Sequence, residues 1–214
     1  ALGPFRIRTM RAQKLLTTVC QRLSQGGRVF ALRGAALSLL LLVAGAATAH
    51  AESPAAYMQR VANQLIAAQR SGSEADYATV LRSHADVPTI AINALGSYAQ
   101  SLAKSDRPAY YAGMINFIAR YAAKEGPKYP VARAIMVGQT QETANGIYVD
   151  SRITLKSGDT YDVRWRLVRR GGVFKVREAE VIGFEMTTFL NTLFQNYISE
   201  NGGNPRTLVI ALNR

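Results

Sequence analysis

Cysteine and histidine are nearly absent from this sequence of 214 residues. Cys20 is the only cysteine, and His50 and His84 are the only histidines. Beyond residue 51 the chain therefore has no disulfide, no thiolate metal ligand and no cysteine nucleophile. A single histidine also falls short of the clustered ligands that a zinc site requires.

Recognisable catalytic motifs are missing as well. The sequence has no G-x-S-x-G nucleophile motif, no phosphate-binding loop and no dinucleotide fingerprint. A small hydrolase that uses His84 is the enzymatic alternative, although a lone histidine is usually structural. Glu178 and Glu180 lie on one side of an expected strand, where a solvated edge is the simpler interpretation. We therefore expect a protein that is not an enzyme and has no cofactor or metal.

Acidic residues are absent from the first 51 positions. The whole chain has 26 Lys and Arg against 14 Asp and Glu, a net charge of +12. Seven of the basic residues precede Glu52, so the remainder has 19 basic and 14 acidic residues and a net charge of +5. The high overall charge thus comes mostly from the N-terminal segment. We expect no nucleic acid partner.

The N-terminal segment has the features of a secretory signal peptide. An apolar run at 35–49 follows several arginines and is shorter than the roughly 20 residues that a membrane-spanning helix needs. It ends in Ala49-His50-Ala51, a small-residue site for a signal peptidase. We expect cleavage after Ala51 and export to the periplasm, with an N-terminal membrane anchor as the alternative.

The domain organisation follows from this leader. We interpret residues 1–51 as the leader and residues 52–214 as a single domain with a sizeable core. Met10 is a candidate initiator, in which case residues 1–9 are not native.

Hydrophobic periodicity predicts an α+β fold. Apolar residues recur at helical spacing in four segments before residue 127 and in two after residue 185. Between them, apolar and polar residues alternate, with turn signals at Ser157-Gly158-Asp159 and Arg170-Gly171-Gly172. We expect N-terminal and C-terminal helices packed on a curved antiparallel sheet of about four strands, the first at 131–143.

The apolar face of this sheet and the facing helices are candidates for the wall of a lipid cavity. On the sheet the candidates are Val149, Ile153, Val163, Trp165 and Leu167. On the helices they are Met114, Phe117, Met186, Leu190 and Phe194. The alternative is that the same residues fill a dry core, which pattern alone favours because cores and cavity linings have the same composition.

The other face of the sheet is expected to be rich in basic residues. Its candidates for partner docking are Arg152, Arg164, Arg166, Lys175 and Arg177. Asp150 and Asp162 lie beside them, so cross-strand ion pairs on a solvated face are the alternative to docking a protein or an anionic lipid surface.

Several motifs in the second half of the chain follow one another in a characteristic order. Phe174-Lys175-Val176 precedes Val181-Ile182-Gly183, and a helix containing Phe194 leads to Gly202 and a short apolar helix at 208–212. This series resembles the C-terminal part of the toluene-tolerance/MlaC family. Upstream, the segments 90–96 and 110–121 are similar to two helices of that family.

The resemblance implies a soluble periplasmic carrier that encloses a phospholipid, or a related membrane lipid, between the sheet and the helices. Its partners would be an inner-membrane ABC transporter with a periplasmic ring and an outer-membrane lipoprotein complex. Glu185, Asn191 and Phe174 depart from residues common in the family, so the headgroup stays open and a triterpenoid is an alternative cargo. An envelope adaptor that uses the basic sheet face is the alternative function.

Overall fold

The structure is a computed structural model that describes residues 52–214. The expected leader, its cleavage site after Ala51 and the candidate initiator lie outside the described residues. The helices are α1 (Pro54–Ser71), α2 (Glu74–His84), α3 (Val87–Leu95), α4 (Arg107–Glu125), α5 (Met186–Glu200) and α6 (Pro205–Leu212). The strands are β1 (Val131–Thr143), β2 (Gly146–Leu155), β3 (Thr160–Arg170), β4 (Val173–Val181) and β5 (Phe184–Glu185). The predicted α+β class is confirmed.

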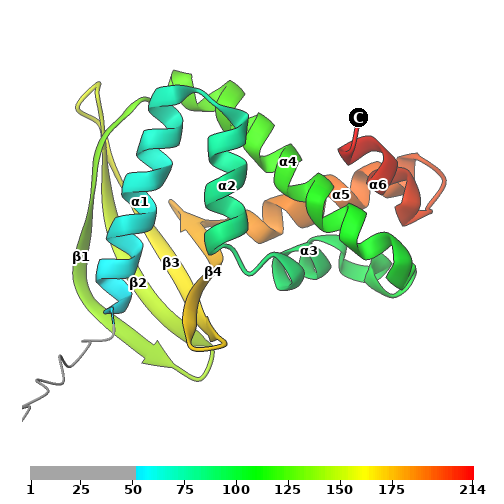
Figure 1. The fold of residues 1–214 in the computed structure, drawn as a ribbon, viewed down its shortest axis with the longest axis horizontal. Coiled ribbons are helices and arrows are strands. Elements are labelled where there is room, and N and C mark those ends of the chain that lie inside the picture. Colours follow the sequence, from blue (N-terminus) through cyan, green and yellow to red (C-terminus); the bar gives the residue numbers. More distant parts are fainter. Residues whose placement is uncertain (1–51) are drawn as a thin grey trace, which may run out of the picture. The chain divides into compact units, whose positions relative to one another are not determined.

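The first helices begin where short polar side chains cap them. The Ser53 hydroxyl accepts a hydrogen bond from the Ala56 amide, and the Ser73 hydroxyl accepts one from the Asp76 amide. Between them Gly72 closes α1 in the left-handed conformation, with φ 66°. These signals turn the chain back on itself, so that α1 and α2 are neighbours in Figure 1.

The strands form one antiparallel sheet in the order β1-β2-β3-β4-β5. The sequence predicts about four strands, and the structure adds a fifth, β5, which has only two residues and pairs with the end of β4. The β3–β4 ladder shifts register between Arg166 and Leu167, where Arg166 pairs with Glu178 and Leu167 with Val176. Arg177 is therefore the extra residue of a β-bulge.

Buried apolar side chains of residues 52–214 form four clusters, and the two largest are a sheet core and a helical core. The sheet core lies where α1 and α2 pack on the sheet; it comprises Tyr57, Met58, Val61, Val80, Ile147, Val149, Leu167 and Phe174. The helical core joins α3, α4, α5 and α6; its members include Leu95, Tyr110, Met114, Leu190, Phe194, Ile198 and Leu208. Figure 1 shows α1 crossing the sheet and the helices α3 to α6 gathered beyond α2.

Candidate functional site: two adjacent apolar cavities

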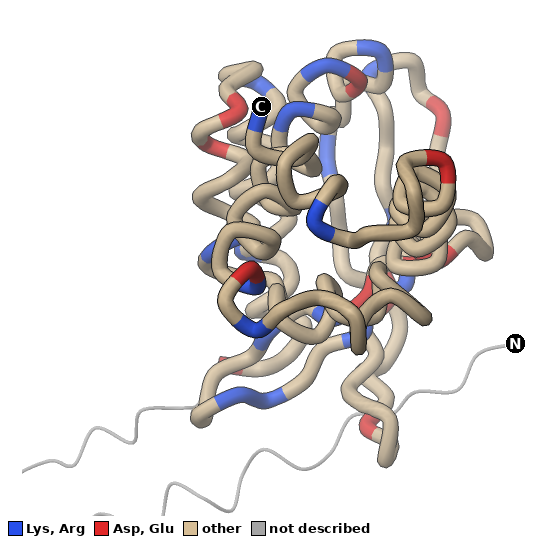
Figure 2. The backbone as a smooth tube through the Cα atoms, turned by 90° about the vertical axis from the view of Figure 1, so that its right-hand side faces the viewer, with Lys and Arg blue, Asp and Glu red and all other residues tan. Residues whose placement is uncertain are grey.

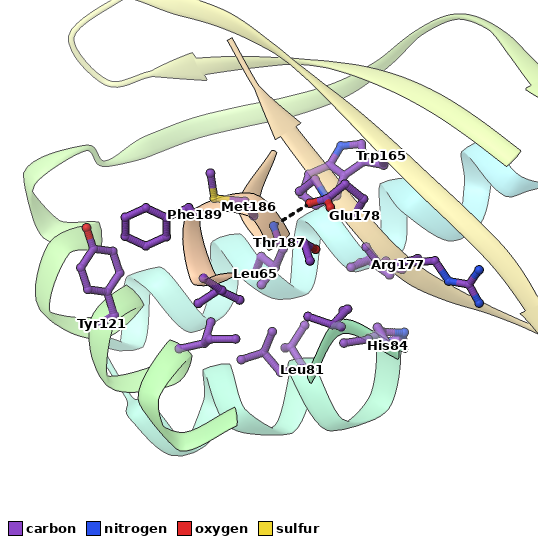
Figure 3. A pocket seen from close by; sticks show the side chains of 18 of the residues that line it. Leu65, Leu81, His84, Tyr121, Trp165, Arg177, Glu178, Met186, Thr187 and Phe189 are labelled. Atoms are coloured by element: carbon purple, nitrogen blue, oxygen red, sulfur yellow. Dashed lines mark hydrogen bonds between the residues drawn. The ribbon is translucent and has the colours of Figure 1, made fainter. Parts of the chain in front are cut away.

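A first cavity of about 240 Å³ lies between the sheet, α1, α2, α4 and α5. Strands β3 and β4 contribute Trp165, Val176 and Ala179, and the helices supply most of the other side chains. In Figure 3, Tyr121, Met186 and Phe189 lie at one end of the cavity, and His84 and Arg177 lie at the other. Its wall is almost wholly apolar, so it suits a hydrocarbon chain.

The few charged residues at this cavity have their polar groups engaged by the protein. The Glu178 carboxylate accepts hydrogen bonds from the amides of Ala179 and Thr187, both at 3.0 Å, and so caps the start of α5. The Arg177 guanidinium donates to the Asp86 carboxylate at 2.8 Å. Because these groups are already paired, they leave the wall of the cavity apolar.

A second cavity of about 260 Å³ lies between α1 and the sheet. Helix α1 supplies Ala62, Leu65 and Ile66, and the strands supply most of the remaining wall. Leu65 and Trp165 line both cavities. The two cavities are therefore neighbours, separated by these two side chains.

Trp165 is held in place by a buried serine. Its indole N–H donates to the Ser151 hydroxyl at 2.8 Å, and that hydroxyl in turn reaches the Val163 carbonyl at 3.3 Å. Ser151 is fully buried on β2, at an inward-facing position between Val149 and Ile153. A partly buried indole is stabilised by such an acceptor, and the small serine also leaves room for the large ring.

The structure divides the ten candidate lining residues into four groups. Phe117, Met186 and Leu190 line the first cavity, Ile153 and Val163 line the second, and Trp165 lines both. The other four line neither cavity and are buried in the cores: Met114, Val149, Leu167 and Phe194.

Sequence reasoning missed the contributions of α1 and Ser151. Val61, Leu65 and Ile66 repeat at helical spacing, and that signal was available, but it did not show which face of the sheet α1 covers. Ser151 interrupts the apolar parity of Val149 and Ile153 on β2. A polar residue at a predicted inward position is the signal that could have found it.

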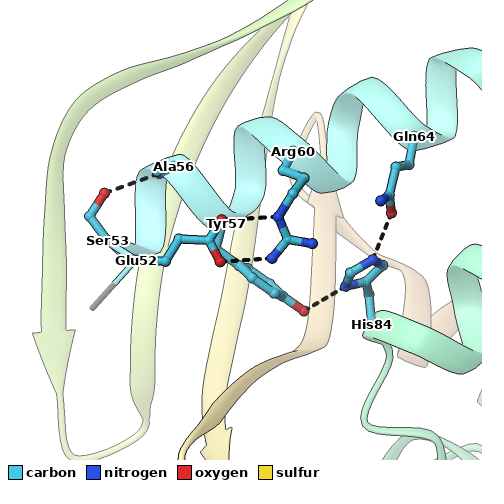
Figure 4. A network of polar contacts seen from close by, with 7 residues as sticks. All are labelled: Glu52, Ser53, Ala56, Tyr57, Arg60, Gln64 and His84. Carbon is cyan, nitrogen blue, oxygen red and sulfur yellow. Dashed lines mark hydrogen bonds and ion pairs between the residues drawn. The ribbon is translucent and has the colours of Figure 1, made fainter. Parts of the chain in front are cut away.

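His84 links α1 to the end of α2. Its Nδ1 lies 3.0 Å from the Tyr57 hydroxyl and its Nε2 lies 2.7 Å from Oε1 of Gln64 (Figure 4). In the neutral ring Nε2–H donates to Gln64, and Nδ1 accepts from Tyr57. Both ring nitrogens are thus occupied, and this arrangement presents neither of them to a serine.

Burial shifts the pKa values of both His84 and Tyr57. Burial and the charges of Arg60 and Lys175 lower the pKa of His84. Burial also raises the pKa of Tyr57 to about 12, so the phenol remains a hydrogen-bond donor at neutral pH. Arg60, which is paired with Glu52 at 2.7 Å, lies over the Tyr57 ring.

The basic residues predicted for the outer sheet face do not all lie there. Arg152 pairs with Asp162, and Arg164 pairs with Asp150, each at 2.8 Å across neighbouring strands. The register also places Arg166 on this face, and within the described chain no hydrogen-bond partner reaches its buried Nε. Figure 2 shows basic and acidic positions spread over both helices and strands.

Of Lys175 and Arg177, only Arg177 departs from the predicted outer face. The Lys175 ammonium donates to the Ser83 carbonyl, and Arg177 pairs with Asp86, so both contact the corner between α2 and α3. The physical reason for Arg177 is the bulge, which breaks the alternation that the prediction assumed. Lys175 keeps the predicted register, but the α2–α3 corner runs along the edge of β4 and lies within its reach.

Exposed apolar side chains lie beside the first cavity. Ile182 and Phe184, at the turn between β4 and β5, are 70% and 73% exposed. Met186 and Phe189 follow in the chain and are themselves partly exposed while lining the cavity. Ile182 adopts a φ of 52°, which is unusual for a β-branched residue and turns it outward next to Gly183.

Two further observations concern the described residues only. Among residues 52–214, no three His, Cys, Asp or Glu side chains gather as a metal site would require. No helix in this range combines the length and the apolar character needed to cross a membrane.

Comparison with known proteins identifies the family. The family model described as MlaC protein matches residues 56–214. A solved structure of a phospholipid-binding protein from Ralstonia solanacearum, in complex with a phospholipid, has a similar fold, with a TM-score of 0.59. The match has 16% sequence identity and covers 74% of this chain and 94% of that one. No curated protein matches the chain. Since the family model covers most of the sequence, the chain belongs to the MlaC family.

Proposed function

We propose that this protein is a soluble periplasmic carrier that encloses the acyl chains of a membrane phospholipid and transfers the lipid chemically unchanged. The observation that carries the proposal is the pair of adjacent apolar cavities, one enclosed by the sheet with α1, α2, α4 and α5 and the other between α1 and the sheet. Membership of the MlaC family supports it, and so does the description of the Ralstonia protein as phospholipid-binding.

The volumes of the cavities limit the free energy that lipid burial can supply. An apolar cavity of about 150 Å³ holds benzene, so each of these cavities holds on the order of ten carbon atoms. Removing a methylene from water is worth about 0.8 kcal/mol, or roughly 8 kcal/mol per filled cavity. Association itself costs about 4–15 kcal/mol. Filling one cavity roughly offsets this cost, whereas filling both leaves a surplus.

The proposed route runs between the two membranes of the envelope. The lipid would pass between an outer-membrane lipoprotein complex and an inner-membrane ABC transporter with a periplasmic ring. The exposed side chains of Met186 and Phe189 support a transient apolar contact at the moment of transfer, because they also line the first cavity, and the exposed Ile182 and Phe184 directly precede them in the chain. The signal peptide predicted from the sequence supports the periplasmic location.

Native mass spectrometry tests the proposal. The full chain would be expressed with its leader, and the exported protein purified from periplasm without detergent. We expect the mass of the folded protein to exceed that of the chain by one membrane lipid, which tandem spectrometry then identifies. A protein that stays empty after incubation with phospholipid vesicles would contradict the proposal.

If the purified protein holds no lipid, the alternative function of an envelope adaptor would be tested next. Reversing Arg164 and Arg166 to Glu should then abolish capture of an envelope partner. If the carrier proposal holds, the same double variant should retain its lipid, because both side chains lie on the face of the sheet away from the cavities.

A further inference from the structure

We infer that His84 makes lipid retention sensitive to pH: in an acidic medium its ring places a positive charge at one end of the first cavity and weakens the hold on the cargo. The inference rests on the proposed function and adds to it a regulatory residue. It requires no particular headgroup, because the charge acts on the apolar wall of the cavity.

His84 lies where the first cavity meets a hollow on the surface. The residue lines the first cavity, and it also lines a hollow of about 320 Å³ that α1 and α2 form together. Only 8% of the residue is exposed. A proton can therefore reach the ring through the hollow, whereas the charge that it brings falls on the wall of the cavity (Figure 3).

The hydrogen bonds of the ring suit its neutral form. Nε2–H donates to Gln64 at 2.7 Å, and Nδ1 accepts from the Tyr57 hydroxyl at 3.0 Å. Protonation turns Nδ1 into a donor, so the Tyr57 hydroxyl must turn its own proton away from the ring. Among residues 52–214, His84 is the only hydrogen-bond partner of this buried hydroxyl. A charged ring therefore leaves a buried donor without an acceptor, which costs free energy.

The charged groups closest to the ring do not favour its protonation. Burial, and then the charges of Arg60 on α1 and Lys175 on β4, lower the pKa of His84. Glu52 acts in the opposite direction, but its carboxylate is paired with Arg60 at 2.7 Å. The positive charges around the ring thus outweigh the one acidic group.

The other charged groups that share these two spaces are held by different partners. Arg177 and Glu178 line the cavity; Arg177 donates to Asp86 at 2.8 Å, and Glu178 accepts from two backbone amides. Asp76 lines the hollow and accepts from Ser71 at 2.6 Å. Within residues 52–214, no carboxylate forms a hydrogen bond or an ion pair with the ring. A charged ring would have no anionic partner.

Cargo in the first cavity should oppose the charge further. Hydrocarbon against the ring keeps water from an imidazolium, whereas the walls of the emptied protein can move and let water reach it. The loaded protein therefore holds the ring neutral more strongly than the empty protein does. By linkage, each unit by which loading lowers the pKa of His84 weakens lipid binding about tenfold at a pH below both values.

Partition of a lipid between protein and vesicles tests the inference. A fluorescent phosphatidylcholine would be equilibrated between the purified protein and phosphatidylcholine vesicles at pH 8 and at pH 5. We expect the partition constant of the wild type to fall about tenfold, for a difference of one unit in pKa, and that of His84→Gln to stay constant. An equal fall in both proteins, or in neither, would overturn the inference and leave the proposed function standing. A protein that takes up no lipid at pH 8 would overturn the proposed function itself.

A second variant shifts the transition without removing the histidine. Tyr57→Phe takes away the donor to Nδ1, so the ring should become charged at a higher pH, and the fall in the partition constant should move with it. Tyr77→Phe, which removes another buried hydroxyl on α2, is the control and should match the wild type. An unshifted transition in Tyr57→Phe, or the same shift in the control, would contradict the inference.

NMR titration of the imidazole provides a direct measurement. The His84 resonance would be assigned by its absence from the spectrum of His84→Gln and followed against pH in the loaded and the delipidated wild type. We expect loading to lower the pKa of His84, as linkage requires. The same pKa in both forms would overturn the inference.

Discussion

The helical core and the region where α1 covers the sheet have similar compositions but different packing. In the helical core Leu95, Tyr110 and Phe194 are buried to 1% exposure or less, and the Tyr110 hydroxyl donates to the Ala91 carbonyl at 2.8 Å. Beside the sheet two cavities remain, one bordered by α1, α2, α4 and α5 and the other by α1. The difference indicates a rigid helical frame beside a surface that is packed loosely enough to admit cargo.

The largest loss of stability is expected when an aromatic side chain of the helical core is truncated. Phe194→Ala should reduce the free energy of unfolding by about 3–5 kcal/mol, because it opens a hole in a dense core. The folded variant should still bind lipid, since Phe194 lines neither cavity. Urea unfolding together with native mass spectrometry measures both effects. A normal stability would show that this core is as loosely packed as the sheet region.

The two regions are joined at the corner between α2 and α3. Asp86 is 5% exposed; its carboxylate accepts from Arg177 and Arg170, and its amide donates to the Val176 carbonyl. Asp86→Asn should lower the free energy of unfolding by about 1.5–3 kcal/mol, the range for hydrogen bonds to charged groups. Thr89→Ala removes one neutral hydroxyl that contacts Arg170 and Asp86, so a smaller loss is expected from it.

The Asp86 carboxyl group should also make the free energy of unfolding depend on pH under acidic conditions. Burial acts to raise the pKa of Asp86, but the hydrogen bond from Arg177 and the charge of Arg170 outweigh it and the pKa is lowered. Its contribution should be complete above the unfolded-state pKa of about 3.9 and be lost as the pH falls below that value. The difference in stability between wild type and Asp86→Asn should therefore shrink on acidification. A difference independent of pH would contradict this account.

His84, in the sheet region, should give a smaller pH dependence of stability, and at a higher pH than Asp86. Its pKa is lowered, so the neutral ring stabilises the fold above the unfolded-state value of about 6.5, and this contribution is lost as the pH falls toward the folded-state pKa. Thermal melts between pH 8 and pH 5 should show a steeper loss for the wild type than for His84→Gln. Equal slopes would show that His84 does not link α1 to α2 through its neutral form.

The exposed side chains beside the first cavity should affect transfer and not stability. Phe184→Ser should change the free energy of unfolding by less than about 0.5 kcal/mol, because the side chain is 73% exposed. We expect slower transfer of a fluorescent phospholipid between donor and acceptor vesicles, with lipid occupancy unchanged. Thr160→Ser, an exposed position at the start of β3, serves as the control. Unchanged transfer would remove Phe184 from the proposed contact.

Much of the fold could be predicted from the sequence because local signals agree with it. Alternation on β2 and β3 gave the correct parity for Val149, Ile153 and Val163, and the serines before α1 and α2 mark where these helices begin. The bulge at Arg177 could not be predicted, since it arises from the pairing of two strands and leaves no local mark in the sequence.

The division between core and cavity could not be predicted from pattern. Met114 and Phe117 are three residues apart on α4, yet the first is buried in the helical core and the second lines a cavity. On α5, Leu190 and Phe194 both belong to the helical core, yet only Leu190 also lines the first cavity. Periodicity places a residue on a helix face, whereas a cavity depends on how far the opposing element stands away from it.

Hydrogen–deuterium exchange of the lipid-loaded and delipidated protein tests the central claim, that cargo fills the space between α1 and the sheet. We predict slower exchange in the loaded protein at amides of α1, β3 and β4, which line both cavities, and little change in α6, whose residues line neither. Protection centred on α6, or no protection in a protein shown to hold lipid, would contradict it.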